Sequence, residues 1–140
     1  MSKWDKRFLE LAQHVAGWSK DPSTQVGAVI VDDQRCVVSL GFNGFPRGVD
    51  DAQERYADKP TKYGMVVHAE ANAILTAKHS VAGCTLYSSL FTCNECAKLI
   101  IQSGIKRVVT YKPNKPHWQC SFNTAQTMYQ EAGVEVVLYE

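Results

Sequence analysis

Apolar segments of strand length alternate with helix-like segments along most of this chain, and that order restricts the folds it can adopt. We expect strands at 26–33, 37–44, 84–91, 106–112 and 134–140. We expect helices at 4–18, 66–78, 93–104 and 121–133. Strands that are joined through a helix run parallel and are linked by right-handed crossovers. The sequence therefore predicts an α/β protein, a three-layer α/β/α sandwich around a five-stranded mixed sheet in the order α-β-β-α-β-α-β-α-β.

Two connecting segments add detail to this picture. A short polar turn joins the first two strands, which is typical of a hairpin. The segment 45–64 is polar and rich in turn residues, and an aperiodic segment of this length in a compact domain is usually a functional or a flexible loop.

We expect Cys36 and Cys84 to be core residues in strands. We expect His14 and His79 to be ordinary helix side chains.

Composition narrows the class of protein. A chain of 140 residues that is 45% apolar and 21% charged is typical of one globular domain, here 1–140. Its net charge of +1 gives no general attraction to nucleic acid or to an anionic membrane. No segment approaches the roughly 20 apolar residues that span a bilayer, and MSKWDKRFLE does not resemble a signal peptide. Five cysteines, an odd number, fit a reducing compartment, so we expect a cytoplasmic protein.

The apolar segment VVHAEANAIL contains two titratable groups, His68 and Glu70, which are costly to bury without partners. A C-x-x-C pair, Cys93 and Cys96, follows at a predicted strand-to-helix junction. One histidine and two cysteines form a donor set that zinc prefers, and three protein ligands leave a fourth position open, as in catalytic sites. Glu70 is then close enough to take a proton from zinc-activated water.

A structural zinc site is the main alternative, with Cys84 or Cys120 as a fourth ligand. That alternative leaves Glu70 without a purpose. The spacing of H-x-E and C-x-x-C, with 24 residues between His68 and Cys93, is the signature of zinc-dependent nucleobase deaminases.

The chain resembles the deoxycytidylate (dCMP) deaminases of the cytidine deaminase superfamily from about Trp18 to Val137. The resemblance is carried by SKDPSTQVGAVIV, GFNGFPRGV, KYGMVVHAEANAI, GCTLYSSLFTCNECAKLIIQSGIKRVV and EAGV. One departure is Thr92, which stands where the family usually has proline before the first cysteine. We expect the Thr92 hydroxyl to cap the following helix in its place.

The resemblance implies hydrolysis of dCMP to dUMP and ammonia, which would supply dUMP for thymidylate synthesis. Water activated by Zn²⁺ would attack C4 of the cytosine ring, and Glu70 would protonate N3 and then carry a proton to the departing amino group. The backbone N–H of Ala69 would hold the pyrimidine carbonyl, and Asn43 would contact the sugar. An alternative for Asn43 is a turn-forming residue before Gly44.

Binding of a nucleotide also requires a phosphate site. The candidates are Lys20, Ser23, Lys115 and His117, because cations and hydroxyl groups suit phosphate. The alternative for each is an ordinary solvated loop residue.

Regulation is a further implication of the resemblance. In that family dCTP with a divalent ion such as Mg²⁺ activates the enzyme and dTTP inhibits it, at a glycine-rich turn between subunits. The corresponding residues are Gly44, Arg47, Gly48, Asp50 and Asp51, for which the alternative is a solvated surface loop. Family members are usually homo-oligomers, often hexamers, so we expect a hexamer.

Three other functions compete with this interpretation. A tRNA adenosine deaminase shares the zinc chemistry, but it must hold a polyanion, whereas this chain is nearly neutral. A free cytidine or deoxycytidine deaminase is a second alternative; that branch tends to run its fourth and fifth strands antiparallel, whereas a crossover precedes the last strand here. The third is a zinc-binding module without catalysis, which would not need Glu70.

Overall fold

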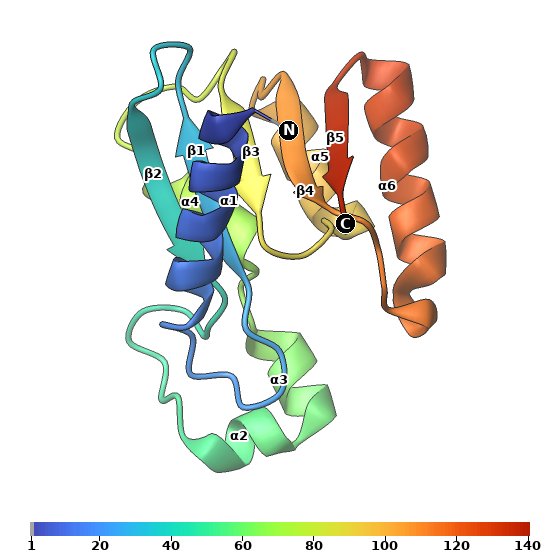
Figure 1. The fold of residues 1–140 in the computed structure, drawn as a ribbon. Helices are drawn as coiled ribbons and strands as arrows, with labels where there is room; N and C mark the ends of the chain where they lie inside the picture. The colour runs from blue at the N-terminus through green and yellow to red at the C-terminus, as the bar shows by residue number, and fades with distance from the viewer. Residues whose placement is uncertain (1) are drawn as a thin grey trace.

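A mixed five-stranded sheet forms the centre of the computed structural model, which describes residues 2–140 (Figure 1). Its spatial order is β2-β1-β3-β4-β5. The strands are β1 (Gly27–Val31), β2 (Val37–Phe42), β3 (Thr85–Ser88), β4 (Arg107–Tyr111) and β5 (Glu135–Tyr139). Strand β1 is antiparallel to both of its neighbours, while β3, β4 and β5 are mutually parallel. All strands that are joined through a helix therefore run in one direction, as predicted.

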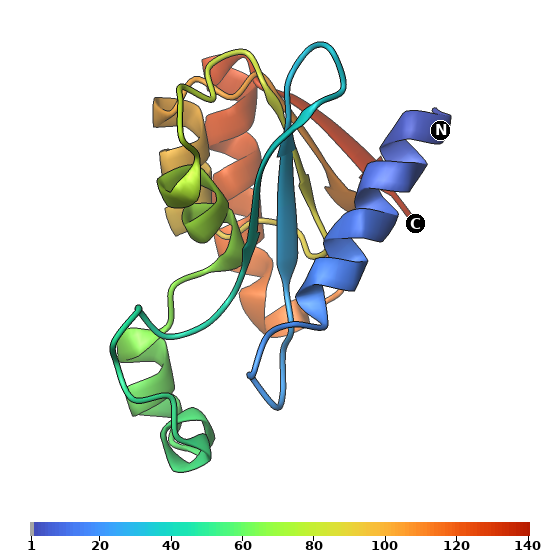
Figure 2. The ribbon, with the colours of Figure 1, turned by 90° about the vertical axis from the view of Figure 1, so that its left-hand side faces the viewer.

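Helices cover both faces of the sheet, which confirms the three-layer sandwich (Figure 2). Helix α1 (Lys3–Ala16) lies alone on one face. The other face carries α4 (Ala69–Thr76), α5 (Asn94–Gln102) and α6 (Gln119–Ala132). Each face has its own core, because side chains alternate between the faces of a strand. Ile30 and Leu86 pack beneath α4, α5 and α6, whereas Val29 and Tyr87 pack beneath α1.

Two glycines allow helices to approach the sheet closely. A Cβ atom on Gly27 would lie 2.1 Å from the backbone oxygen of Ala12 in α1. A Cβ atom on Gly41 would lie 2.3 Å from the backbone oxygen of Ala69 in α4. Both distances are far below van der Waals contact, so these positions exclude any larger residue unless a helix moves. Gly41 in particular fixes the first turn of α4 against β2.

A buried ion pair fastens α1 to the sheet. Asp5, which is only 4% exposed, accepts two hydrogen bonds from the guanidinium of Arg107, at 2.9 and 2.7 Å. It also accepts hydrogen bonds from the hydroxyl groups of Tyr87, at 2.7 Å, and Tyr139, at 3.2 Å. The carboxylate thus connects the first helix to β3, β4 and β5, and its charge is balanced and fully hydrogen-bonded.

The segment 45–64 differs most from its predicted form. It contains α2 (Gln53–Ala57) and α3 (Lys59–Met65), and together they extend beyond one end of the sheet (Figure 1). Both helices are too short to show a clear apolar period, which explains why the sequence suggested an irregular loop. Asp58 begins α3 by accepting a hydrogen bond from the Thr61 backbone N–H.

Two smaller predictions were also wrong. Cys36 lies in the exposed turn between β1 and β2, not in a strand of the core, although Cys84 is buried as expected. Helix α4 ends at Thr76, so His79 lies outside it, while His14 does lie in α1.

None of the helices within residues 2–140 has the length and apolar character needed to cross a bilayer.

Thr92 does not cap α5. The N-cap residue is Cys93, whose sulfur accepts a hydrogen bond from the Cys96 backbone N–H. The hydroxyl of Thr92 instead pairs with that of Tyr129 in α6, at 2.5 Å, and both residues are fully buried. Thr92 therefore ties the start of α5 to α6, because its side chain faces the core between the two helices.

Candidate active site

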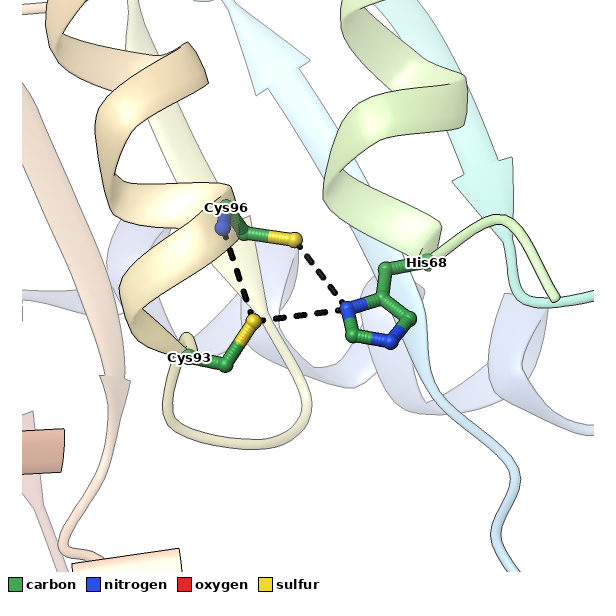
Figure 3. Close-up of side chains that lie close together, drawn as sticks. All are labelled: His68, Cys93 and Cys96. Carbon is green, nitrogen blue, oxygen red and sulfur yellow. Dashed lines mark hydrogen bonds between the residues drawn. The ribbon is translucent and has the colours of Figure 1, made fainter. Parts of the chain in front are cut away.

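The three predicted metal ligands meet where the first turns of α4 and α5 lie side by side (Figure 3). His68 is the N-cap residue of α4, and Cys93 and Cys96 belong to the first turn of α5. The Nδ1 atom of His68 lies 3.3 Å from Sγ of Cys96 and 3.4 Å from Sγ of Cys93. All three donor atoms lie within 4.8 Å of one another. The fold thus brings together ligands that are far apart in sequence.

This donor set fits a zinc ion. Tetrahedral zinc with ordinary Zn–N and Zn–S bond lengths places nitrogen and sulfur ligands about 3.5 Å apart, close to the two distances of 3.3 and 3.4 Å found here. Cys84 and Cys120, which could have completed a structural site, are not part of the cluster. Within residues 2–140 the cluster has three members, which leaves a fourth tetrahedral position for water or substrate.

The electrostatics of the cluster also favour a cation. A hydrogen bond with Cys96 holds the pKa of the Cys93 thiol well below its ordinary value. The same interaction and burial raise the pKa of the Cys96 thiol, because a second negative charge is opposed at this distance in apolar surroundings. A divalent cation between the two sulfur atoms removes that opposition and stabilises both thiolates.

Glu70 lies in the first turn of α4, two residues after the histidine ligand, and is only 4% exposed. Burial raises the pKa of its carboxyl group to about 7. A nearby cation would lower this pKa again. Glu70 is therefore a buried carboxyl beside the cluster whose protonation state depends on the charge of its surroundings, as a proton carrier requires.

A cleft of about 440 Å³ opens beside the cluster, within the size range of small-molecule sites. Its inner part includes the buried residues Glu70, Ala69 and Asn43. Three further predicted residues, Ser23, Lys115 and His117, line its more exposed part. Five predicted substrate residues thus meet the cleft together with Glu70, although they come from four separate segments.

Lys20, the sixth candidate for substrate binding, does not line the cleft. Its ammonium lies 2.7 Å from the carboxylate of Asp51, one of the predicted regulatory residues, in an exposed ion pair. The other regulatory candidates also lie outside the cleft lining. Gly48 has a left-handed backbone with φ of 83°, and Arg47 and Asp50 are exposed.

Gly44 has a direct connection to the site. Its N–H donates to the carbonyl of Val67 at 3.1 Å, and the N–H of Val67 donates back at 2.8 Å. Val67 immediately precedes His68. The turn that contains Gly44 is therefore held by two hydrogen bonds to the residue next to a predicted metal ligand.

Several residues of the cleft wall were not predicted from the sequence. Asp21 and Lys62 form a buried ion pair in the cleft wall. Lys59 adds a third lysine, and the rings of Tyr63 and Trp118 meet edge to face across the cleft, with centroids 6.4 Å apart. Four of these five lie in α3 or in the short 3₁₀ helix Pro116–Trp118, where no sequence pattern indicated a cleft wall. Asp21 did carry a signal, since an aspartate before Pro-Ser-Thr is typical of a side-chain-capped turn.

Comparison with known proteins agrees with this geometry. The family model described as the cytidine and deoxycytidylate deaminase zinc-binding region matches residues 2–112. A relative from Aliivibrio fischeri, described as an uncharacterized deaminase in the luxG 3′ region, is 46% identical over 97% of this chain and 93% of its own length. The deoxycytidylate deaminase of Homo sapiens is 43% identical over 94% of this chain and 77% of its own length.

A solved structure supports the same assignment. The dCMP deaminase of the cyanophage S-TIM5, in complex with dCMP and dUMP, superposes with a TM-score of 0.79 and 25% identity, covering 99% of each chain. The chain belongs to the cytidine and deoxycytidylate deaminase family and is an enzyme of the deaminase class. The alternative of a zinc-binding module without catalysis is therefore set aside.

Proposed function

We propose that this chain catalyses the hydrolytic deamination of dCMP to dUMP, with release of ammonia. The observation that carries the proposal is the His68, Cys93 and Cys96 donor set beside the buried carboxyl of Glu70, at the inner end of one cleft. Relatives named as deoxycytidylate deaminases, and a similar structure that holds dCMP and dUMP, support the choice of substrate.

In the proposed reaction the metal-binding residues and Glu70 have separate roles. When bound to His68, Cys93 and Cys96, zinc supplies a Lewis acid that lowers the pKa of water to about 7, so that a nucleophile is available at neutral pH. Glu70 takes a proton from the attacking water and delivers it to N3 of the pyrimidine. Glu70 then transfers the second proton of the water to the amino group, which leaves as ammonia while the C4 carbonyl of dUMP forms.

Ala69 and Asn43 are suited to hold the base and the sugar. Ala69 is the first residue of α4, so its backbone N–H has no partner within the helix and can donate to the pyrimidine carbonyl. The amide of Asn43 is held by the backbone N–H of Val26, at 2.9 Å, and by the carbonyl of Thr24, at 2.9 Å. One lone pair of the Asn43 amide oxygen remains for a sugar hydroxyl.

The outer part of the cleft is suited to a phosphate group. Lys59, Lys115 and His117 line it, and neither lysine forms an ion pair within residues 2–140. Unpaired cations at the open end, opposite a buried carboxyl, favour a nucleotide over a nucleoside. The parallel pairing of β4 with β5 also argues against a free cytidine deaminase, and the absence of a general positive charge argues against a tRNA substrate.

Replacement of Glu70 by glutamine tests the catalytic proposal. Glutamine keeps the size of the side chain but cannot carry the proton, so we expect Glu70→Gln to retain about one zinc ion per chain and to lose nearly all ammonia release from dCMP. Zinc content by elemental analysis and ammonia release by a coupled assay give the two readouts. Activity close to that of the wild-type enzyme would overturn the assignment.

We further propose that dCTP with Mg²⁺ activates the enzyme and that dTTP inhibits it. We propose that the enzyme is a cytoplasmic homo-oligomer, a hexamer, of single 1–140 domains. Its product dUMP would supply thymidylate synthesis. The family resemblance motivates this regulation, and the hydrogen bonds between Gly44 and Val67 offer a route from the effector turn to His68. Activity that does not respond to either nucleotide at any dCMP concentration would refute regulation. Sedimentation in solution tests the hexamer.

A further inference from the structure

A buried ion pair in the cleft wall joins two segments that are far apart in sequence. Lys62 of α3 is 8% exposed and Asp21 is 2% exposed. The Lys62 ammonium lies 2.8 Å from Oδ2 and 3.1 Å from Oδ1 of Asp21, and it donates to Oγ of Ser23 at 2.9 Å. Two of these contacts are hydrogen bonds, to Oδ1 of Asp21 and to Oγ of Ser23, and the third is a charge contact with Oδ2. Lys62 therefore lines the cleft with its charge balanced by Asp21 and its ammonium held on the 19–26 turn.

Asp21 organises the other side of this contact. Its carboxylate accepts hydrogen bonds from the backbone N–H groups of Ser23, at 2.9 Å, and Thr24, at 3.2 Å. It also accepts a long hydrogen bond from the side-chain amide of Asn43, at 3.4 Å. Burial alone would raise the pKa of Asp21, but the hydrogen bonds from Lys62 and from these backbone groups outweigh it and lower the pKa. The carboxylate is therefore charged, and it shapes the turn that contacts Asn43.

Stability alone is a poor explanation for this arrangement. A buried ion pair often contributes no more to stability than a well-packed apolar pair, because both charges lose their hydration. What the ion pair adds is a defined position of the two charged side chains relative to each other. Here that geometry connects α3, which carries the cleft residues Lys59 and Tyr63, to the turn that carries Ser23 and contacts Asn43.

We propose that Asp21 and Lys62 are positioning residues, whose ion pair holds α3 and the 19–26 turn in register so that the cleft wall fits the sugar and phosphate of the substrate. This inference rests on the proposed function. Neither residue contacts the donor atoms of the metal site. Loss of the pair should therefore weaken substrate binding more than it slows the chemical step.

The test compares the wild-type enzyme with Lys62→Met, Asp21→Asn and the double variant, measured for zinc content, kcat and KM with dCMP. We expect the single variants to raise KM about 10- to 100-fold, the change that corresponds to a loss of about 1.4–2.8 kcal/mol of binding free energy. We expect kcat to change by no more than about threefold and zinc to be retained. The double variant should be less impaired than the product of the single effects, because it leaves no unpaired buried charge. Lys62→Arg should recover part of the loss in KM.

The ion pair of Asp5 and Arg107, on the opposite face of the sheet, provides a matched control. Arg107→Met also leaves a buried carboxylate unpaired, so it should lower the melting temperature without raising KM for dCMP. If Lys62→Met and the double variant raise KM no more than Arg107→Met does, the positioning role is overturned. If the wild-type enzyme does not deaminate dCMP at all, the proposed function itself fails. The two failures are therefore distinguishable.

Discussion

The buried carboxylate of Asp5 should make the stability of the protein depend on pH in acid. Hydrogen bonds from Arg107, assisted by those from Tyr87 and Tyr139, outweigh burial and hold the pKa of Asp5 at about 2, below its ordinary value of 3.8. A carboxyl group whose pKa is lowered by folding stabilises the folded state above its unfolded pKa and loses that contribution as pH falls through its folded pKa. The contribution is therefore complete at neutral pH and absent below about pH 2.

The size of the effect follows from the shift. One pKa unit corresponds to about 1.4 kcal/mol, so lowering the pKa from 3.8 to about 2 contributes about 2 kcal/mol at pH 7. Roughly half of this should be lost by about pH 3, where the unfolded carboxyl is largely protonated and the folded one is not. A contribution of this size is a substantial part of the stability of a small domain.

Urea unfolding from pH 7 to pH 3 isolates this contribution when wild-type protein is compared with Asp5→Asn. The difference in free energy of unfolding between the two should shrink by about 1 kcal/mol over that range, because asparagine does not titrate. Asp33→Asn is the control, since Asp33 is exposed and forms no ion pair within the described residues. A difference that stays constant from pH 7 to pH 3 would contradict the assigned role of Asp5.

Two further predictions concern close packing around the site. Gly41→Ala and Gly27→Ala should each destabilise the protein by about 1–3 kcal/mol or more through overpacking. Only Gly41→Ala should also reduce bound zinc, because the predicted ligand His68 is the N-cap residue of α4. Equal zinc loss in both variants would contradict this. Thr92→Val should cost about 1–3 kcal/mol in urea unfolding, because it leaves the buried Tyr129 hydroxyl without its partner. Adding Tyr129→Phe should recover part of that loss, and simple additivity of the two changes would count against the contact.

The arrangement of the sheet and the metal site could be predicted because local patterns determine them. Strand-like runs separated by helices imply parallel strands, and H-x-E and C-x-x-C each stand at the start of a helix, where the fold brings them together. The donor atoms of His68 and the two cysteines then meet because α4 and α5 pack side by side on the same face of the sheet. The sequence therefore indicated which donor groups come together and where in the fold they lie.

The cleft wall could not be predicted in the same way, because it depends on tertiary contacts of short elements. Helix α3 is seven residues long and has no apolar period that would reveal its buried face. No sequence pattern therefore singled out Lys62, although it is buried against Asp21. Lys20 resembled a phosphate ligand, but it pairs with Asp51 at the surface. Thr92 was expected to cap a helix, but its hydroxyl instead forms a hydrogen bond with that of Tyr129, which lies 37 residues further along the chain.

Ammonia release by the zinc-loaded enzyme, offered dCMP, CMP, deoxycytidine and dCTP separately, tests the proposed function most directly. The unpaired cations in the outer cleft predict that a nucleotide is preferred over deoxycytidine. The similarity to deoxycytidylate deaminases predicts the highest kcat/KM of the four for dCMP. Equal or better turnover of deoxycytidine would contradict the phosphate site. No turnover of any of the four, with zinc bound, would contradict the proposed reaction.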